Sequence, residues 1–305
     1  MRYLERGVAA ITAILIVAVA ASAATLMLAQ QAAMLDQTML VASRAQADVY
    51  AQAGLEWARG VLIEDARGSS VDALNEGWAR PIAGMPIDRA VVAGNIVDEQ
   101  GKFNLNNVID GTKRSEADIK LLRRLLASLD LSPDLADAVV DWIDGDDDLT
   151  SGAGAENAYY LSLPRPYRAA NAPMVQVEEL YRVRGFDAAT VAKLRPYVTA
   201  LRERTAINAN TAPDLVVAAA FGVPREKVAA LLAGRDKDPF GDKGGFVAAA
   251  GRDNLIAVND FDVKSSWFSV RIQVAQDDVV LGSEALMRRD APKGTAAIIW
   301  RRPLY

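Results

Sequence analysis

Residues 8–29, VAAITAILIVAVAASAATLMLA, contain neither a charged residue nor a proline. A helix needs about 20 consecutive apolar residues to cross the hydrocarbon core of a bilayer, so this stretch is long enough to span one. A cleavable export signal has an apolar core of about 7–15 residues, followed by a small-residue cleavage site. The present stretch is longer and runs without a break into a polar helical pattern. It therefore predicts a membrane-spanning helix that is retained.

The charges before this stretch predict its orientation. Arg2, Arg6 and the starting amine all precede residue 8. An excess of basic charge beside a membrane span favours the cytoplasmic side. The N-terminus is therefore expected in the cytoplasm and the bulk of the chain outside it.

The helical pattern continues well beyond the apolar stretch. Apolar residues recur at steps of three and four with polar residues between them, as in an amphipathic helix; they are Leu35, Met39, Ala42, Ala45, Val49, Ala53, Trp57 and Val61. We predict one helix from about residue 8 to about residue 65, whose second half packs on a domain. Leu55, Trp57 and Trp78 are expected in the core.

Composition excludes several kinds of chemistry. The 305 residues include no cysteine and no histidine, and the formal net charge is −5. Disulfides, thiol nucleophiles, thiolate metal sites and histidine bases are therefore excluded, together with the commonest zinc ligand. The net negative charge gives no general attraction to nucleic acid or anionic lipid. The length and the apolar content of 51% are sufficient for one large or two modest domains beside the anchor.

Strand patterns flank a block of helical pattern. Residues 87–105 alternate around an Asp-Glu-Gln-Gly turn as a hairpin does, and residues 267–302 contain three more strand-like segments. Between them, Ser115 with Asp118 three residues later is typical of a helix capping box. The predicted fold is α+β: a long N-terminal helix packed on a small antiparallel sheet, with a large all-α insert between strands.

The same patterns divide the chain into five parts. They are a short charged segment at 1–7, a membrane-spanning helix at 8–29, the first part of an α/β unit at 30–108, a helical insert at 109–255 and C-terminal strands at 256–305. The insert contains an acidic loop and two helix pairs, and it interrupts the sheet in sequence.

The acidic loop of the insert predicts a cation site. Asp144, Asp146 and Asp148 alternate in sequence, Asp147 lies beside them, and Glu156 follows after two glycines. Calcium takes about six to eight oxygen ligands, and alternating carboxylates in one loop can converge on one ion. Because the chain has no cysteine or histidine ligand to offer, calcium is the ion that fits best.

Other interpretations of this loop remain open. The spacing is similar to the start of an EF-hand loop, but Leu149 stands where that loop has glycine and Glu156 comes one residue late, so a different loop geometry is expected. A solvated acidic turn is the simplest alternative, although four aspartates within five residues repel one another. A catalytic carboxylate pair has no supporting substrate motif in the sequence.

Two segments of the insert, 177–198 and 207–235, have the pattern of helix-hairpin-helix units. Such units bind DNA phosphate through backbone amides at a glycine-rich turn, which leaves nucleic-acid binding as an alternative. Here each turn lacks its second glycine, Asp187 would repel phosphate, and Pro224 removes a donor amide. The prediction is therefore that the chain does not bind nucleic acid, and that the nearby arginines form a solvated basic face: Arg182, Arg184, Arg195, Arg202 and Arg204.

At the N-terminus, a short charged leader ends in Arg6-Gly7, an apolar helix follows directly after the glycine, and an amphipathic pattern continues it. In these features the N-terminus resembles that of a type IV prepilin. The resemblance implies that a prepilin peptidase cuts between Gly7 and Val8 and methylates the new terminus. Most members have glutamate at the fifth mature position, where this chain has Thr12. A subunit without that glutamate can dispense with one neighbour, as a subunit at a filament tip would.

Four further motifs are GKFNLNNV at 101–108, VVDWIDGDDDLTSGAGAENAYY at 139–160, PYRAANAP at 166–173 and INANTAPDLV at 207–216. With these motifs the chain resembles the minor pseudopilin K family of the type II secretion system. The resemblance implies a non-enzymatic protein of the inner membrane with a periplasmic domain. It also implies structural calcium bound at the acidic loop.

The resemblance further implies a function in assembly and export. Such a protein joins minor pseudopilins I and J at the tip of a periplasmic pseudopilus, which helps to export folded proteins across the outer membrane. Two other classes remain as alternatives, a DNA-uptake minor pilin and an anchored carboxylate hydrolase. A DNA gel shift and an activity test on Asp144→Ala would distinguish them.

Overall fold

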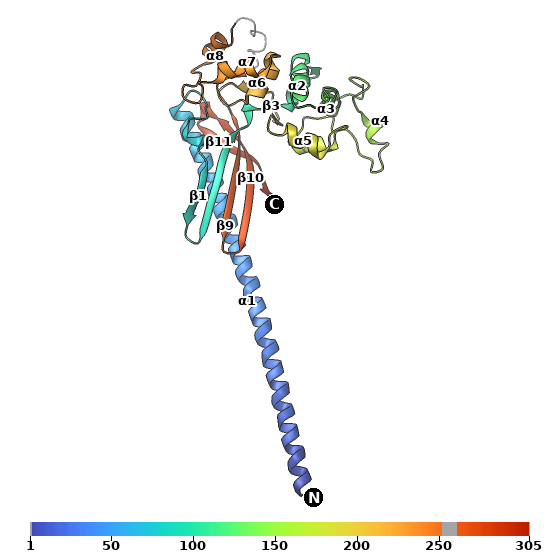
Figure 1. Cartoon of the computed structure of the whole chain (residues 1–305), viewed down its shortest axis with the longest axis vertical. Helices are drawn as coiled ribbons and strands as arrows, with labels where there is room; N and C mark the ends of the chain where they lie inside the picture. The colour runs from blue at the N-terminus through green and yellow to red at the C-terminus, as the bar shows by residue number, and fades with distance from the viewer. Residues whose placement is uncertain (1, 252–260, 305) are drawn as a thin grey trace.

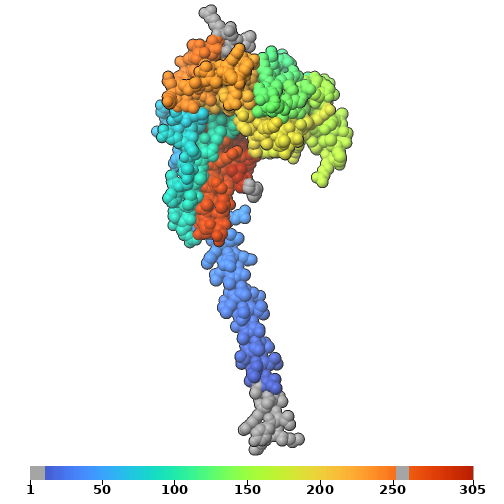
Figure 2. Space-filling model, viewed as in Figure 1, coloured from blue at the N-terminus to red at the C-terminus, as the bar shows by residue number. Residues whose placement is uncertain are grey.

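The computed structural model describes residues 2–251 and 261–304. A single long helix runs out of a head that is made of an antiparallel sheet and a mainly helical part (Figure 1). The helical part lies at the end of the sheet farthest from the N-terminus and extends to one side (Figures 1 and 2). The predicted fold class is confirmed.

Helix α1 spans Arg2–Gly68. One continuous helix was predicted from about residue 8 to about residue 65, and the observed helix also includes the residues before it. Its segment Ile11–Gly68 contains a window of mean hydropathy 2.4, so it is long and apolar enough to cross a membrane. Side chains from residue 11 to residue 42 are exposed, with Ile14 at 69% and Leu28 at 67% exposure. Apolar surface of this extent requires lipid or other helices around it.

The second half of α1 packs on the sheet. Its buried residues recur at steps of three and four, so they form one stripe; they are Ala47, Ala51, Leu55, Ala58 and Leu62. Small residues in this stripe let the helix approach the sheet closely. At Gly54 a Cβ atom would lie 3.2 Å from the side chain of Ile272, so this position has little room for a side chain.

The prediction that Trp57 lies in the core is wrong, whereas Leu55 and Trp78 are buried as predicted. Leu55 is 1% exposed and Trp78 2%, but Trp57 is 53% exposed. The reason is helical geometry: two residues apart on an α-helix means about 200° of rotation, so residues 55 and 57 lie on opposite faces.

The sheet has five antiparallel strands in the order β1-β2-β9-β10-β11. Their bounds are Ile82–Ile87, Ala90–Asp98, Trp267–Gln276, Val279–Asp290 and Thr295–Leu304. The three C-terminal strands were predicted correctly. Trp78, in a short 3-10 helix η1 (Gly77–Ala79), meets Phe268 of β9 edge to face at 5.3 Å between ring centroids.

The predicted hairpin at 87–105 is wrong in its position and its turn. The actual hairpin joins β1 to β2 through Asp88 and Arg89, and Asp88 adopts a φ of 53° in that turn. The Asp-Glu-Gln-Gly segment instead leads out of the sheet as a 3-10 helix, η2 (Glu99–Gly101). Its first turn is capped because the buried Asp98 carboxylate accepts a hydrogen bond from Gln100 N.

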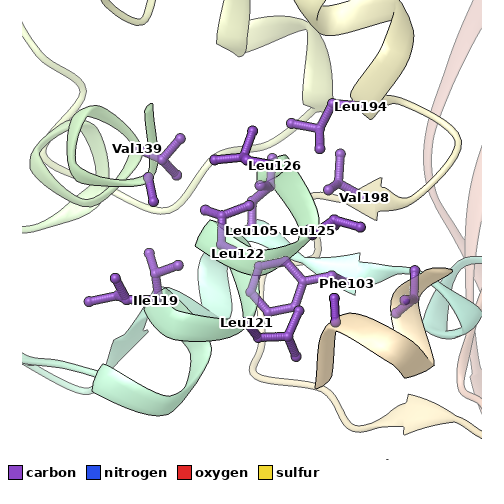
Figure 3. Packing of buried hydrophobic residues seen from close by; sticks show 14 of the residues in the cluster. Phe103, Leu105, Ile119, Leu121, Leu122, Leu125, Leu126, Val139, Leu194 and Val198 are labelled. Carbon is purple, nitrogen blue, oxygen red and sulfur yellow. The ribbon is translucent and has the colours of Figure 1, made fainter. Parts of the chain in front are cut away.

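The insert lies between β2 and β9 in sequence. Its helices are α2 (Glu116–Ser128), α3 (Leu135–Ile143), α4 (Asn157–Tyr160), α5 (Ala188–Leu194), α6 (Asp214–Phe221), α7 (Arg225–Leu232) and α8 (Lys243–Ala250), with 3-10 helices η3 (Leu105–Val108) and η4 (Val177–Arg182). Figure 3 shows its core, in which Leu122 and Leu125 of α2 pack around Phe103 and Leu105. Helix α2 begins after Ser115, as the capping pattern predicted.

The insert has two similar halves, and one asparagine side chain makes a matching pair of hydrogen bonds within each half. Asn106 donates to Met174 O and accepts from Met174 N, and Asn210 makes the same pair of bonds with Phe240. Each half also starts and ends in a short parallel strand pair: β3 (Phe103–Asn104) with β6 (Val198–Thr199), and β7 (Ile207–Asn208) with β8 (Phe261–Asp262). A small hairpin, β4 (Ile109–Asp110) and β5 (Lys113–Arg114), precedes α2.

Candidate metal centre

Three carboxylates converge in the first half of the insert. Asp141 lies in the last turn of α3, Asp144 caps the end of that helix and Glu156 precedes α4. Each offers an oxygen within 4.8 Å of the others, and their exposures are 0%, 6% and 3% respectively. Ionised carboxylates this close and this buried need a positive partner.

The hydrogen bonds leave free oxygens on all three groups. Thr150 donates to Asp141 Oδ1 from its backbone nitrogen at 2.9 Å and from its hydroxyl. Arg114 donates to Asp144 Oδ2 from Nε at 3.2 Å and Nη2 at 3.0 Å. Asp141 Oδ2, Asp144 Oδ1 and both oxygens of Glu156 have no partner within the described residues, although they are buried. Four oxygen atoms are thus left available to a hard cation.

The electrostatics of the group also favour a positive charge beside it. Burial, followed by the charges of Asp141 and Asp144, raises the pKa of Glu156 to about 8. Burial also raises the pKa of Asp144, although the hydrogen bonds from Arg114 oppose this shift. Without a cation the group therefore holds on to a proton, and a divalent ion would favour the ionised carboxylates.

Aromatic packing and backbone contacts hold the loop in place. Trp142 meets Tyr160 edge to face at 5.2 Å, which anchors the end of α3 to α4. Arg184 donates to Gly154 O at 2.8 Å, and its guanidinium lies 4.9 Å from the ring centroid of Tyr159. Asn171, which follows α4 in sequence, donates a hydrogen bond to Asp146 O in the same loop.

The structure brings together two of the five predicted ligands. Asp144 and Glu156 lie in the convergent group, whereas Asp146, Asp147 and Asp148 lie exposed on the loop outside it. Asp141 was missed by the sequence analysis. A spacing of three places it on the same helical face as Asp144, which is the signal that could have identified it.

A side chain at Gly154 should disable this site. An added Cβ would lie 1.9 Å from Asp141 Oδ2, one of the free oxygens, so Gly154→Ala must displace that carboxylate. We expect the variant to lose stabilisation by calcium, measured as the difference in melting temperature with and without the ion. Gly152→Ala is the matched control, because no described atom would lie within 4 Å of an added Cβ there. An equal loss in that variant would contradict the assignment.

The two glycine turns of the insert face protein side chains. A Cβ at Gly222 would lie 2.4 Å from the guanidinium carbon of Arg124, which also donates to Ala219 O and Ala220 O at the end of α6. At Gly185 a Cβ would meet Leu135 at 2.6 Å. These turns thus differ from an open phosphate-binding turn. Three of the five nearby arginines also have internal partners: Arg184, Arg195 and Arg204.

A rod-like helix, apolar in its first half and packed on an antiparallel sheet in its second, defines a pilin-like protein that here carries a helical insert. Family models described as type II secretion system protein K match residues 101–203 and 207–271, which correspond to the two halves of the insert. The chain belongs to the family of type II secretion system protein K, as the sequence motifs indicated.

Individual relatives support this assignment. Type II secretion system protein K of Pseudomonas aeruginosa is 35% identical over 81% of this chain and 77% of its own length. The protein of the same name from Aeromonas hydrophila is 32% identical over 88% of each chain. A chain in the solved GspK-GspI-GspJ complex from the type 2 secretion system of enterotoxigenic Escherichia coli matches with a TM-score of 0.80 and 25% identity, over 88% of this chain and 99% of that one.

Proposed function

We propose that this chain is the minor pseudopilin at the tip of a type II secretion pseudopilus, needed for pseudopilus assembly and for export of folded proteins from the periplasm. The observation that carries this proposal is the shape of the head. The insert extends sideways at the end of the head farthest from the N-terminus (Figure 2). A repeating shaft needs room for a subunit above each subunit, and a head of this form suits an end position.

The same helix serves two environments in this proposal. After insertion into the inner membrane with its leader in the cytoplasm, prepilin peptidase cuts between Gly7 and Val8 and methylates the new terminus. The helix then leaves the lipid and packs among the helices of other pseudopilins, where matched apolar surfaces replace lipid. The exposure of Ile14 and Leu28 fits both states, because neither side chain is covered by the chain's own head.

An exposed stripe on the second half of α1 is the proposed partner surface. It lies on the helix face opposite the buried stripe and consists of Ala42, Ala45, Val49, Ala53 and Trp57. Val49 is 62% exposed and Trp57 53%. Small residues around a tryptophan allow a second helix to approach and bury the indole ring, so a helix of pseudopilin I or J is the proposed occupant. The solved relative forms a complex with GspI and GspJ.

Trp57→Ala should weaken this complex without unfolding the head. Buried interface tryptophans contribute about 2 kcal/mol or more, so we expect roughly a thirtyfold loss of affinity. The measurement is co-purification of the full chain with pseudopilins I and J from detergent. Glu226→Ala, at an exposed position in the first turn of α7 and away from α1, is the control. Equal recovery of both variants would refute the surface.

Calcium is the proposed occupant of the metal centre. Asp141, Asp144 and Glu156 would hold it through their free oxygens, and the exposed aspartates Asp146, Asp147 and Asp148 would supplement the ligands from the loop. The ion would supply positive charge that fixes α3 against α4, so its function is structural. Four buried oxygens that have no donor within residues 2–251 and 261–304 support this assignment, and the same arrangement gives no support to a hydrolase.

The proposed function predicts a defect in cells. A strain without this chain should fail to export its type II substrates, and the full-length chain should restore export. The rival DNA-uptake pilin would instead retard DNA in a gel-shift experiment, for which we expect no shift. Restored export together with co-purification of pseudopilins I and J would support the tip assignment; normal export without the chain would refute it.

A further inference from the structure

Arg114 occupies a special position beside the metal centre. It ends strand β5, and its guanidinium lies 3.0 Å from Asp144 Oδ2, 3.9 Å from Asp141 Oδ1 and 4.0 Å from Asp146 Oδ1. The same group donates to Asp148 O at 2.8 Å. One side chain thus contacts both the end of α3 and the acidic loop.

The guanidinium and a cation can be present together. Arg114 donates its hydrogen bonds to Asp144 Oδ2, whereas the free oxygen of that carboxylate is Oδ1. The nearest contact of Arg114 on Asp141 is likewise with Oδ1, which Thr150 already occupies, and Asp141 Oδ2 stays free. Arg114 therefore leaves every free oxygen of the group uncovered.

The charges decide what this arrangement does. The positive guanidinium partly compensates the three carboxylates, so it stabilises the group when no ion is bound. When a divalent ion is bound, the same charge repels it across a short, partly buried distance. Both effects reduce the free-energy gain on binding.

We propose that Arg114 is a built-in counter-charge that holds the ion-free loop closed and lowers the affinity of the metal centre for calcium. This inference depends on the proposed calcium site. It makes the site reversible: the loop keeps its shape when the ion leaves, and ion binding adds stability without having to build the loop. Arg114 acts through Asp144 and the loop backbone, so it is a positioning residue and not a ligand.

The test is calorimetric titration of calcium into the full chain in detergent, with Arg114→Gln and Arg114→Lys as variants. Glutamine removes the charge, and we expect about tenfold tighter calcium binding together with a lower melting temperature of the ion-free protein. Lysine keeps the charge, and we expect an affinity within about threefold of that of the parent chain. If the glutamine variant unfolds without calcium, the calcium affinity of the lysine variant tests the proposal by itself. A tenfold gain in affinity in the lysine variant would refute the role of charge.

Arg184→Gln is the matched control. Arg184 also touches the loop, but it donates to the carbonyl oxygens of Gly152 and Gly154 and pairs with none of the three carboxylates. We expect little change in calcium affinity from this variant. Equal gains from Arg184→Gln and Arg114→Gln, or no gain from Arg114→Gln, would overturn the inference. Absence of calcium binding to the parent chain would instead refute the calcium site itself.

Discussion

Removal of calcium with a chelator is expected to lower the melting temperature of the full chain by roughly 5–10 °C. An ion that binds only the folded state adds about 2.7 kcal/mol of stability at a concentration of about 100 times its Kd. A chain of this size gains about 2–4 °C for each kcal/mol. The ion would also supply positive charge to Asp141, Asp144 and Glu156, which together have four buried oxygens without a donor among the described residues. Thermal unfolding in detergent, followed by circular dichroism, measures the shift.

Glu156→Gln should change the melting temperature differently with and without calcium, which tests the site directly. Without calcium Glu156 holds a proton at neutral pH, because its pKa is raised to about 8, and glutamine copies that neutral form, so the variant should melt close to the temperature of the parent chain. With calcium it should melt lower, because a ligand is lost. Glu116→Gln, the same change at an exposed position in the first turn of α2, should leave the calcium shift intact. A chelator effect of the same size in the Glu156 variant would contradict the site.

The parts of the fold that the sequence predicted are those with long local patterns. Helix α1 repeats its apolar spacing over many turns, and the three C-terminal strands alternate beside turns rich in polar residues. The hairpin at 87–105 was placed wrongly because the chain leaves the sheet after Asp98, whose carboxylate lies in a buried hydrogen-bond network with Ser265 and Asn208. Contacts so distant in sequence leave no local pattern.

The candidate site was predicted in part for the same reason. The run of aspartates from Asp144 is visible in sequence, and so is Glu156 beyond the glycines. Which of these side chains point inward depends on where α3 ends and on Arg114, which lies 30 residues before Asp144 in the sequence. Asp141 was passed over because it lies within the helix, although its spacing to Asp144 places both on one face.

The C-terminal end of α1 is fastened by a buried arginine. Arg289 of β10 is 5% exposed. It donates to Asp65 at 2.9 Å, to both oxygens of Asp72 at 2.5 and 2.6 Å and to Ser265 O at 2.7 Å. Its guanidinium also lies 4.8 Å from the ring centroid of Phe268. One side chain therefore joins the helix, the segment that follows it, the end of the insert and the sheet.

Arg289→Met should destabilise the head by about 3–5 kcal/mol, because the removal of one partner of a buried ion pair leaves the other charge uncompensated. This corresponds to a drop in melting temperature of roughly 10 °C or more. Methionine fills much of the same space, so the loss reports charge and hydrogen bonds more than volume. Arg301→Met is the control: its pair with Asp48 is exposed, and exposed pairs contribute about 0–1 kcal/mol.

The loss caused by Arg289→Met should depend on pH. Burial, followed by the charges of Glu76 and Asp72, raises the pKa of Asp65 to about 6, and burial raises the pKa of Asp72 too, while Arg289 opposes both shifts. Because the pKa of Asp65 is higher in the folded state, protonation of Asp65 stabilises that state. This contribution to stability is complete below the unfolded pKa of about 4 and is lost as pH rises through about 6. Without Arg289 both pKa values rise further, so the window of loss extends above pH 6. The deficit of the variant relative to the parent chain should therefore shrink when unfolding is measured at pH 5 instead of pH 8. A deficit that is the same at both values would mean that lost packing, and not unpaired carboxylates, causes the destabilisation.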